Sequence, residues 1–152
     1  MAAERRAEVI WQGTLTQGNG RLKVGSGAFG EQAITWASRA ERPDGKTSPE
    51  ELIAAAHAGC YAMALSNTLA QGGTPAEELT VNAICTLDLQ QVKITTMNLE
   101  VQGRVPGLDE QGFQQAAQKA EQSCPVSNAL RNNVQIHLNA HLAQQPQVTS
   151  NR

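Results

Sequence analysis

A long alanine-rich stretch that begins at Ser48 constrains the fold of this chain more than any other part of its sequence. Ser48 can cap a helix, Pro49 suits the first helical position, and Glu51 completes a capping box. Residues 52–70 are apolar on several sides, and the glycines at 72–73 end the run. A surface helix needs only one apolar stripe, so we expect this helix to be buried in the middle of the structure.

Short β-compatible runs lie before this helix, at residues 8–15, 21–24 and 33–36. Turn segments that contain Gly, Asn and Ser separate them. The simplest arrangement of such runs is an N-terminal antiparallel meander.

Two longer segments with alternating hydrophobicity follow the helix, at residues 80–89 and 92–105. They resemble a long hairpin that turns at residues 90–91. The apolar phase of the second segment changes near residues 95–96, which predicts a β-bulge there.

A second helix is predicted to start at an Asp109 cap, and its apolar stripe continues to Cys124. Pro125 breaks or restarts that helix, and a last alternating strand covers residues 134–142. Strands, helix, strands, helix and strand together indicate an α+β domain.

The chain of 152 residues is expected to form a single domain over residues 1–143, with a polar C-terminal tail at residues 144–152. The formal charge of -2 and the charged fraction of 17% provide no basic stripe for nucleic acid or anionic lipid. No apolar run approaches the ~20 residues of a membrane span, and no signal-peptide pattern is present. We therefore expect a cytoplasmic protein with neither nucleic acid nor membrane as a partner.

Three cysteines are widely spaced, and no CxxC motif or His-containing ligand box accompanies them, so we expect no metal site. Cys60 lies inside the long helix, where it is either a small core residue or a working thiol. If a short helix restarts at Pro125, Cys124 lies at or near its cap, where the helix dipole favours a thiolate, and a structural role and a working thiol both stand as interpretations. Cys85 lies in the core phase of a strand, which indicates packing alone.

A cysteine attacks a peroxide as the thiolate, which is only roughly 3% of an unperturbed thiol at pH 7. A cationic partner is therefore required. Arg39 and Arg42 precede the helix, and His57 lies one turn before Cys60. Glu50, in the first turn, can hold an arginine through a bidentate ion pair. For His57, a packing or hydrogen-bonding role and modulation of the thiolate both stand as interpretations.

Two segments resemble the cysteine motifs of the OsmC/Ohr family: SPEELIAAAHAGCYAMAL at residues 48–65 and CPVS at residues 124–127. The likeness runs from the strand at residues 11–13 to the last strand near Leu142, and the His-Ala-small-Cys version is similar to the OsmC branch. The resemblance implies an OsmC-like fold, in which antiparallel β-sheets wrap around long central helices in an intertwined homodimer. It also implies active sites near the subunit interface.

By this resemblance, Cys60 matches the peroxidatic cysteine, Cys124 the resolving cysteine and Glu50 the carboxylate that orients an arginine. Arg39 is the best match for that arginine. The loop is about one residue longer than in the family pattern, so Arg42 stays an alternative, although it precedes a proline in a turn. Cys85 is a departure from the two-cysteine pattern.

The resemblance implies a cysteine-based peroxidase that reduces organic hydroperoxides, and hydrogen peroxide less well, through a sulfenic acid and a Cys60–Cys124 disulfide. No cofactor is expected. A dithiol reductant is required, and the resemblance suggests lipoyl dithiols carried by protein partners. The alternatives are a thiol-based redox sensor or binding protein without efficient turnover, and a structural domain with inert cysteines.

Overall fold

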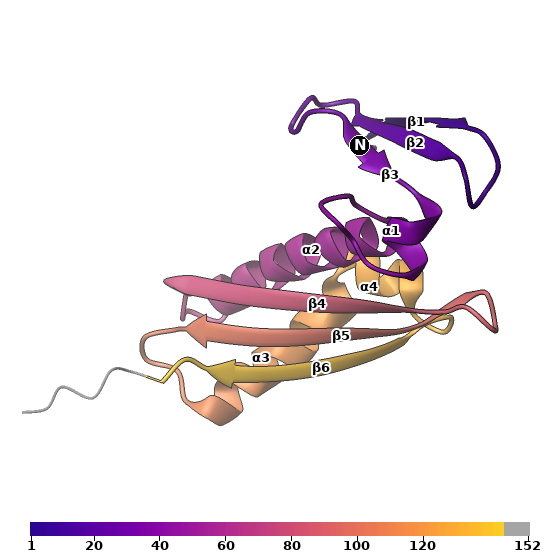
Figure 1. The fold of residues 1–152 in the computed structure, drawn as a ribbon. Coiled ribbons are helices and arrows are strands. Elements are labelled where there is room, and N and C mark those ends of the chain that lie inside the picture. The colour runs from indigo at the N-terminus through magenta and orange to yellow at the C-terminus, as the bar shows by residue number, and fades with distance from the viewer. Residues whose placement is uncertain (145–152) are drawn as a thin grey trace, which may run out of the picture.

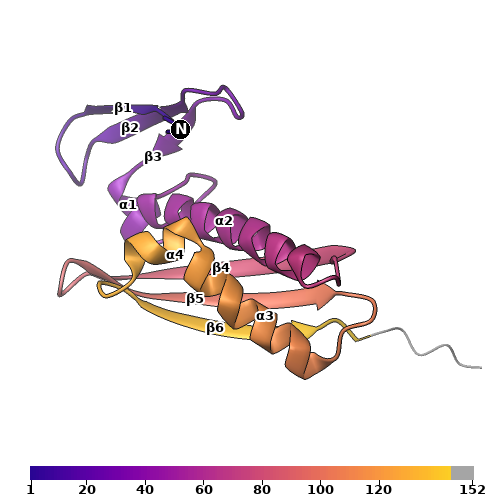
Figure 2. The same ribbon diagram turned by 180° about the vertical axis from the view of Figure 1, so that it is seen from behind.

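The computed structural model describes residues 1–144, which form two three-stranded sheets and helices α1–α4 (Figures 1 and 2). One sheet is built from the N-terminal strands and stands apart from the rest of the chain. The other sheet carries α2 and α3 side by side on one of its faces. Apart from Gln144, the polar tail expected at residues 144–152 lies outside the described residues.

The N-terminal sheet is the predicted antiparallel meander, of β1 (Ala7–Gln12), β2 (Asn19–Val24) and β3 (Gln32–Ile34). Its order is β1-β2-β3, and its strands have their main contacts with one another. Every residue of β1 is exposed. Within one chain this sheet therefore has almost no core of its own.

Helix α1 (Trp36–Ala40) corrects the prediction that the third strand continues to Trp36. Thr35 accepts a hydrogen bond from the Ser38 backbone N–H, and Ser38 Oγ accepts one from the Thr35 N–H, each at 3.0 Å. This reciprocal cap satisfies two backbone donors and turns the chain into a helix. The local capping chemistry is stronger here than the β preference of the tryptophan.

Helix α2 (Pro49–Gln71) begins and ends where the sequence predicts. Ser48 accepts a hydrogen bond from the Glu51 N–H at 3.1 Å. The Glu51 carboxylate accepts from Thr47 Oγ1 at 2.8 Å. The expected capping box is therefore made from one side, because the Glu51 side chain binds Thr47 in place of the Ser48 backbone.

The two faces of α2 differ in burial, so within a single chain the expected burial of this helix in the middle of the structure is seen on one face only. One line of residues is fully buried and spaced by four: His57, Tyr61, Leu65 and Leu69. On the other side Met63 is 70% exposed, and the small residues Ala55, Ala56 and Gly59 are exposed as well. A single chain thus leaves one apolar face of its longest helix uncovered.

Strands β4 (Glu78–Asp88) and β5 (Lys93–Arg104) form the predicted long antiparallel hairpin. Thr86 pairs with Thr96, but Leu87 pairs with Ile94, so the intervening residue of β5 is the extra residue of a bulge. The phase change in the sequence is confirmed at this position.

The second sheet is mixed, which corrects the expectation of antiparallel sheets alone. Helices α3 (Glu110–Ser123) and α4 (Pro125–Leu130) connect β5 to β6 (Gln135–Leu142), and β6 pairs parallel to β5. The helical crossover carries the chain back to the end of the sheet where β5 begins, so the following strand runs in the same direction. The sheet order is β4-β5-β6.

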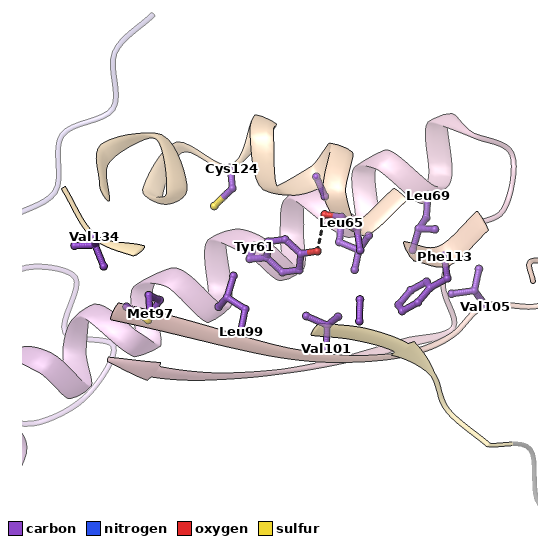
Figure 3. Packing of buried hydrophobic residues seen from close by; sticks show 13 residues of the cluster. Tyr61, Leu65, Leu69, Met97, Leu99, Val101, Val105, Phe113, Cys124 and Val134 are labelled. Atoms are coloured by element: carbon purple, nitrogen blue, oxygen red, sulfur yellow. Dashed lines mark hydrogen bonds between the residues drawn. The ribbon is translucent and has the colours of Figure 1, made fainter. Parts of the chain in front are cut away.

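The core lies between α2, α3 and the helix-facing side of β4–β6 (Figure 3). Leu65 and Leu69 of α2 lie in one cluster with Leu99 of β5 and Phe113 of α3. Each of these residues is at most 1% exposed. The Tyr61 hydroxyl donates a hydrogen bond of 2.8 Å to a backbone carbonyl of α3. This packing holds α2, and with it Cys60, in a defined position over the sheet.

Candidate active site

Two of the three cysteines meet where α2 passes the junction of α3 and α4. Cys60 Sγ lies 3.3 Å from Cys124 Sγ, although the residues are 64 positions apart. Cys124 is completely buried, and Cys60 is partly exposed. A disulfide needs a sulfur–sulfur distance near 2.04 Å, so a closure of about 1.3 Å joins the two.

Cys124 owes its position to the break between two helices. It follows the last residue of α3 and is the N-cap of α4, with Pro125 at the first helical position. Its sulfur accepts a hydrogen bond from the backbone N–H of Ser127 at 3.5 Å. The predicted placement of this cysteine at a helix start is confirmed.

Among the described residues, no cationic side chain lowers the pKa of the Cys60 thiol. Burial raises the pKa of the Cys60 thiol, and the neighbouring Cys124 raises it further. A hydrogen bond from the backbone of Val126 lowers the pKa and opposes part of this effect. The Cys60 sulfur therefore has a second thiol at close range, but its surroundings in a single chain disfavour the thiolate.

Arg39 and Glu50 form the ion pair that the sequence suggests. Arg39 Nη2 lies 2.8 Å from Glu50 Oε1, and Nε lies 3.1 and 3.2 Å from the two carboxylate oxygens. Glu50 is 8% exposed, so its carboxylate is shielded from solvent, whereas the Arg39 side chain is 35% exposed. Arg42 is exposed and has no carboxylate partner among residues 1–144. It lines one open cleft together with Arg39 and Glu50.

This ion pair faces Cys85 and not Cys60 within one chain. Arg39, Glu50 and Cys85 line one open cleft between α1, the start of α2 and β4. Burial raises the pKa of the Cys85 thiol, and the Glu50 charge adds to the rise. Glu50 precedes Cys60 by ten residues on α2, which is about 15 Å along a helix axis. The expected arginine and the expected nucleophile are therefore apart in a single chain.

A buried polar pair lies one helical turn from the two thiols. His57 Nε2 is 2.7 Å from Ser127 Oγ, and both residues are completely buried. Burial lowers the pKa of His57, and the charge of Glu121 opposes part of the shift. Sequence reasoning singled out His57 but missed Ser127. The signal was its place three residues after Cys124, on the same side of a helical turn.

Two further expectations concern metals and membranes. No group of three His, Cys, Asp or Glu side chains comes together to hold a metal ion within the described part of the chain. Over the same residues, none of the helices has the length and apolar character that crossing a membrane requires.

Comparison with known proteins adds a family to this geometry. A family model described as OsmC-like protein matches residues 42–139, a span that includes both Cys60 and Cys124. The chain belongs to the OsmC-like protein family. The resemblance seen in the two cysteine motifs is thereby confirmed.

Curated OsmC-like relatives cover most of the chain. This chain is 35% identical over 133 residues to "Peroxiredoxin OsmC" of Escherichia coli. The aligned region covers 86% of this chain and 92% of that protein. The chain is 33% identical over 98 residues to the "Organic hydroperoxide resistance protein" of Xanthomonas axonopodis pv. citri, over 60% of this chain and 65% of that protein.

Solved structures of OsmC-like proteins share the fold. The organic hydroperoxide resistance protein OhrB of Bacillus subtilis is 25% identical, with a TM-score of 0.67, over 89% of this chain and 97% of that one. An organic hydroperoxide resistance protein of Elizabethkingia anophelis is 23% identical, with a TM-score of 0.71, over 94% and 100% of the two chains. The α+β fold of the OsmC-like family is thus present in this chain.

Proposed function

We propose that this protein is a thiol peroxidase that reduces organic hydroperoxides with Cys60 as the peroxidatic and Cys124 as the resolving cysteine. The observation that carries the proposal is the 3.3 Å separation of their sulfur atoms, with one thiol partly exposed and the other buried beneath it. The names of the curated relatives, a peroxiredoxin and hydroperoxide resistance proteins, support the same chemistry.

The reaction starts with the Cys60 thiolate, which attacks the terminal oxygen of the hydroperoxide. The O–O bond breaks, an alcohol leaves after protonation, and Cys60 becomes a sulfenic acid. Cys124 then attacks the sulfenic sulfur, water leaves, and the disulfide forms. An external dithiol reduces the disulfide by exchange and restores both thiols. We propose a lipoyl dithiol carried by a protein partner for this role.

The cation for Cys60 comes from a second subunit in this proposal. Three features of a single chain support the need for a second subunit. Cys60 has a raised pKa, the apolar face of α2 is uncovered, and the N-terminal sheet exposes Val9, Ile10 and Trp11 at 47%, 46% and 39%. A homodimer would cover both apolar surfaces.

The positions of residues along α2 indicate how the two subunits pair. The exposed small residues Ala55, Ala56 and Gly59 allow a second helix to approach closely. If two copies of α2 cross antiparallel with a two-fold axis near residue 55, residue 50 of one copy lies level with residue 60 of the other. The Arg39–Glu50 pair of one subunit then reaches Cys60 of its partner, where Arg39 stabilises the thiolate and the developing alkoxide.

Peroxide consumption by cysteine variants tests the proposal. With cumene hydroperoxide and a dithiol reductant, Cys60→Ser should abolish the reaction. Cys124→Ser should permit one oxidation of Cys60 but block disulfide formation, so that a sulfenic acid can be trapped. Parallel assays with hydrogen peroxide give the substrate preference, which we expect to favour the organic peroxide. Wild-type rates in Cys60→Ser would refute the catalytic assignment.

A further inference from the structure

The proposed reaction gives no role to His57 and Ser127, a polar pair that is buried beside the two thiols. His57 and Ser127 have no solvent exposure, and their side chains are joined at 2.7 Å. The second ring nitrogen, His57 Nδ1, is buried without a hydrogen-bond partner among the described residues. A buried polar pair with an unsatisfied atom is less stable than apolar packing would be, so its presence needs a reason other than stability.

The pair is placed symmetrically with respect to the thiols. His57 lies three residues before Cys60 on α2, and Ser127 lies three residues after Cys124 at the start of α4. The backbone N–H of Ser127 donates to Cys124 Sγ at 3.5 Å, while its hydroxyl is held by His57. Ser127 therefore contacts the helix of one thiol and the sulfur atom of the other.

Helix α4 depends on such a contact because it is short. It has six residues, and a helix of that length has little stability of its own in water. Its position over α2 is therefore set by tertiary contacts. His57–Ser127 joins α2 to α4 through two side chains, and the backbone of Val126 in α4 also hydrogen-bonds the Cys60 side chain of α2.

We propose that the His57–Ser127 pair positions the resolving thiol, because it fixes the start of α4 against α2 and so keeps Cys124 Sγ within reach of Cys60 Sγ. This inference rests on the proposed use of the two thiols as a redox pair. His57 and Ser127 are positioning residues, since neither side chain is hydrogen-bonded to a sulfur atom; only the Ser127 backbone is.

The step that they serve is the closure of the disulfide. Cys124 loses its thiol proton, and its sulfur attacks the sulfenic sulfur of Cys60. The S–S bond forms as the S–O bond breaks, and the leaving hydroxide takes up a proton to become water. The oxidation level of the Cys60 sulfur falls as that of the Cys124 sulfur rises, so no further oxidant is needed. The rate of this step depends on how often the two sulfur atoms are in attacking geometry.

The experiment measures how readily the two thiols form a disulfide, without any peroxide. Wild type, His57→Leu and Ser127→Ala are equilibrated in glutathione redox buffers at pH 7, and the fraction of the Cys60–Cys124 disulfide is quantified. We expect the equilibrium constant for disulfide formation to fall at least tenfold in both variants, about 30 mV for a two-electron couple. His57→Gln, which retains a hydrogen-bonding group, should recover most of the loss.

Tyr61→Phe is the matched control. It removes a buried hydrogen bond of 2.8 Å from the same helix, one residue after Cys60, but that bond joins α2 to α3 and not to α4. We expect its disulfide equilibrium to stay within about twofold of wild type even where its melting temperature falls. The double variant His57→Leu/Ser127→Ala should lose no more than either single variant, because one interaction has been removed.

Rapid-mixing kinetics with cumene hydroperoxide separate the two steps. In His57→Leu and Ser127→Ala, oxidation of Cys60 should stay within about twofold of wild type, while disulfide closure slows at least tenfold and the sulfenic acid accumulates. The inference is overturned if both variants match wild type in the glutathione equilibrium, or if Tyr61→Phe loses as much as they do. Failure of the wild type to consume peroxide would sink the proposed function instead, and the glutathione result would still decide the role of His57.

Discussion

Two regions of helix α2, one around Cys60 and one around Glu50, bring different chemical groups together. At Cys60, near the middle of the helix, two thiols lie 3.3 Å apart, no cation of residues 1–144 lowers the pKa of Cys60, and burial raises it. At Glu50, in the first turn, an arginine and a carboxylate are paired beside Cys85, a thiol with no second thiol next to it. In the proposed function, one region supplies the nucleophile and the other supplies the charge that activates it.

This difference teaches that a single chain completes its core but keeps apart the thiols and the arginine that the proposed function brings together. The core between α2, α3 and the second sheet needs nothing from outside the chain, since its central side chains are fully buried. The Arg39 side chain and the first strand of the N-terminal sheet, in contrast, are exposed within the described residues. The following predictions test the separation of these two regions.

The largest effect is expected from Arg39→Gln. If Arg39 stabilises the thiolate and the alkoxide, its loss should slow oxidation of Cys60 by cumene hydroperoxide about 100- to 1,000-fold, as for the loss of one oxyanion-stabilising donor. Rapid-mixing kinetics give this rate. Arg42→Gln is the matched control, since it removes the same charge from the same cleft, and we expect a change within about twofold. The reverse pattern would assign the role to Arg42.

Mixing two inactive chains tests whether the regions act across subunits. Arg39→Gln supplies an intact Cys60, and Cys60→Ser supplies an intact Arg39. In an equal mixture with random exchange, half of the dimers are mixed and each of these has one complete site. We therefore expect about one quarter of the wild-type activity to return. No recovery, in chains shown to exchange subunits, would place the arginine and the thiol of each site in one chain.

The buried histidine is expected to make the stability of the thiol region depend on pH. Burial lowers the pKa of His57 in the folded state, with Glu121 of α3 opposing the shift, so below about pH 6.5 the unfolded chain binds more protons than the folded one. The free energy of unfolding should then decrease as the pH falls, by up to about 1.4 kcal/mol per unit. Denaturant titrations should show this decrease reduced in His57→Gln. If the free energy of unfolding changes equally with pH in wild type and His57→Gln, folding does not lower the pKa of His57.

The smallest effect is expected from Cys85→Ala. This thiol lies beside the ion pair, but burial and the Glu50 charge raise its pKa and keep it protonated. Peroxide consumption by the variant should stay within about twofold of wild type, and alkylation of Cys85 in wild type should be slower than that of a free thiol. A loss of tenfold or more would show that Cys85 contributes to the site formed around Arg39.

Local sequence chemistry determined most elements of this fold. The bounds of α2 follow from Ser48, Pro49 and the glycines after residue 71, and the bulge in β5 follows from a phase change in apolar residues. Cys124 was placed at a helix start because Pro125 restarts a helix. These predictions hold because caps, prolines and apolar alternation act over a few residues, where the chain itself supplies all the partners.

Only the tertiary structure decided how these elements meet. The parallel pairing of β6, the approach of Cys124 to Cys60, the His57–Ser127 contact and the separation of Arg39 from Cys60 join residues far apart in sequence. Helix α1 differs from the predicted strand because the reciprocal Thr35–Ser38 cap outweighs the β preference of the tryptophan between them. Sequence patterns specify which face of an element is apolar, but the packing of all the faces together selects which side chains come into contact.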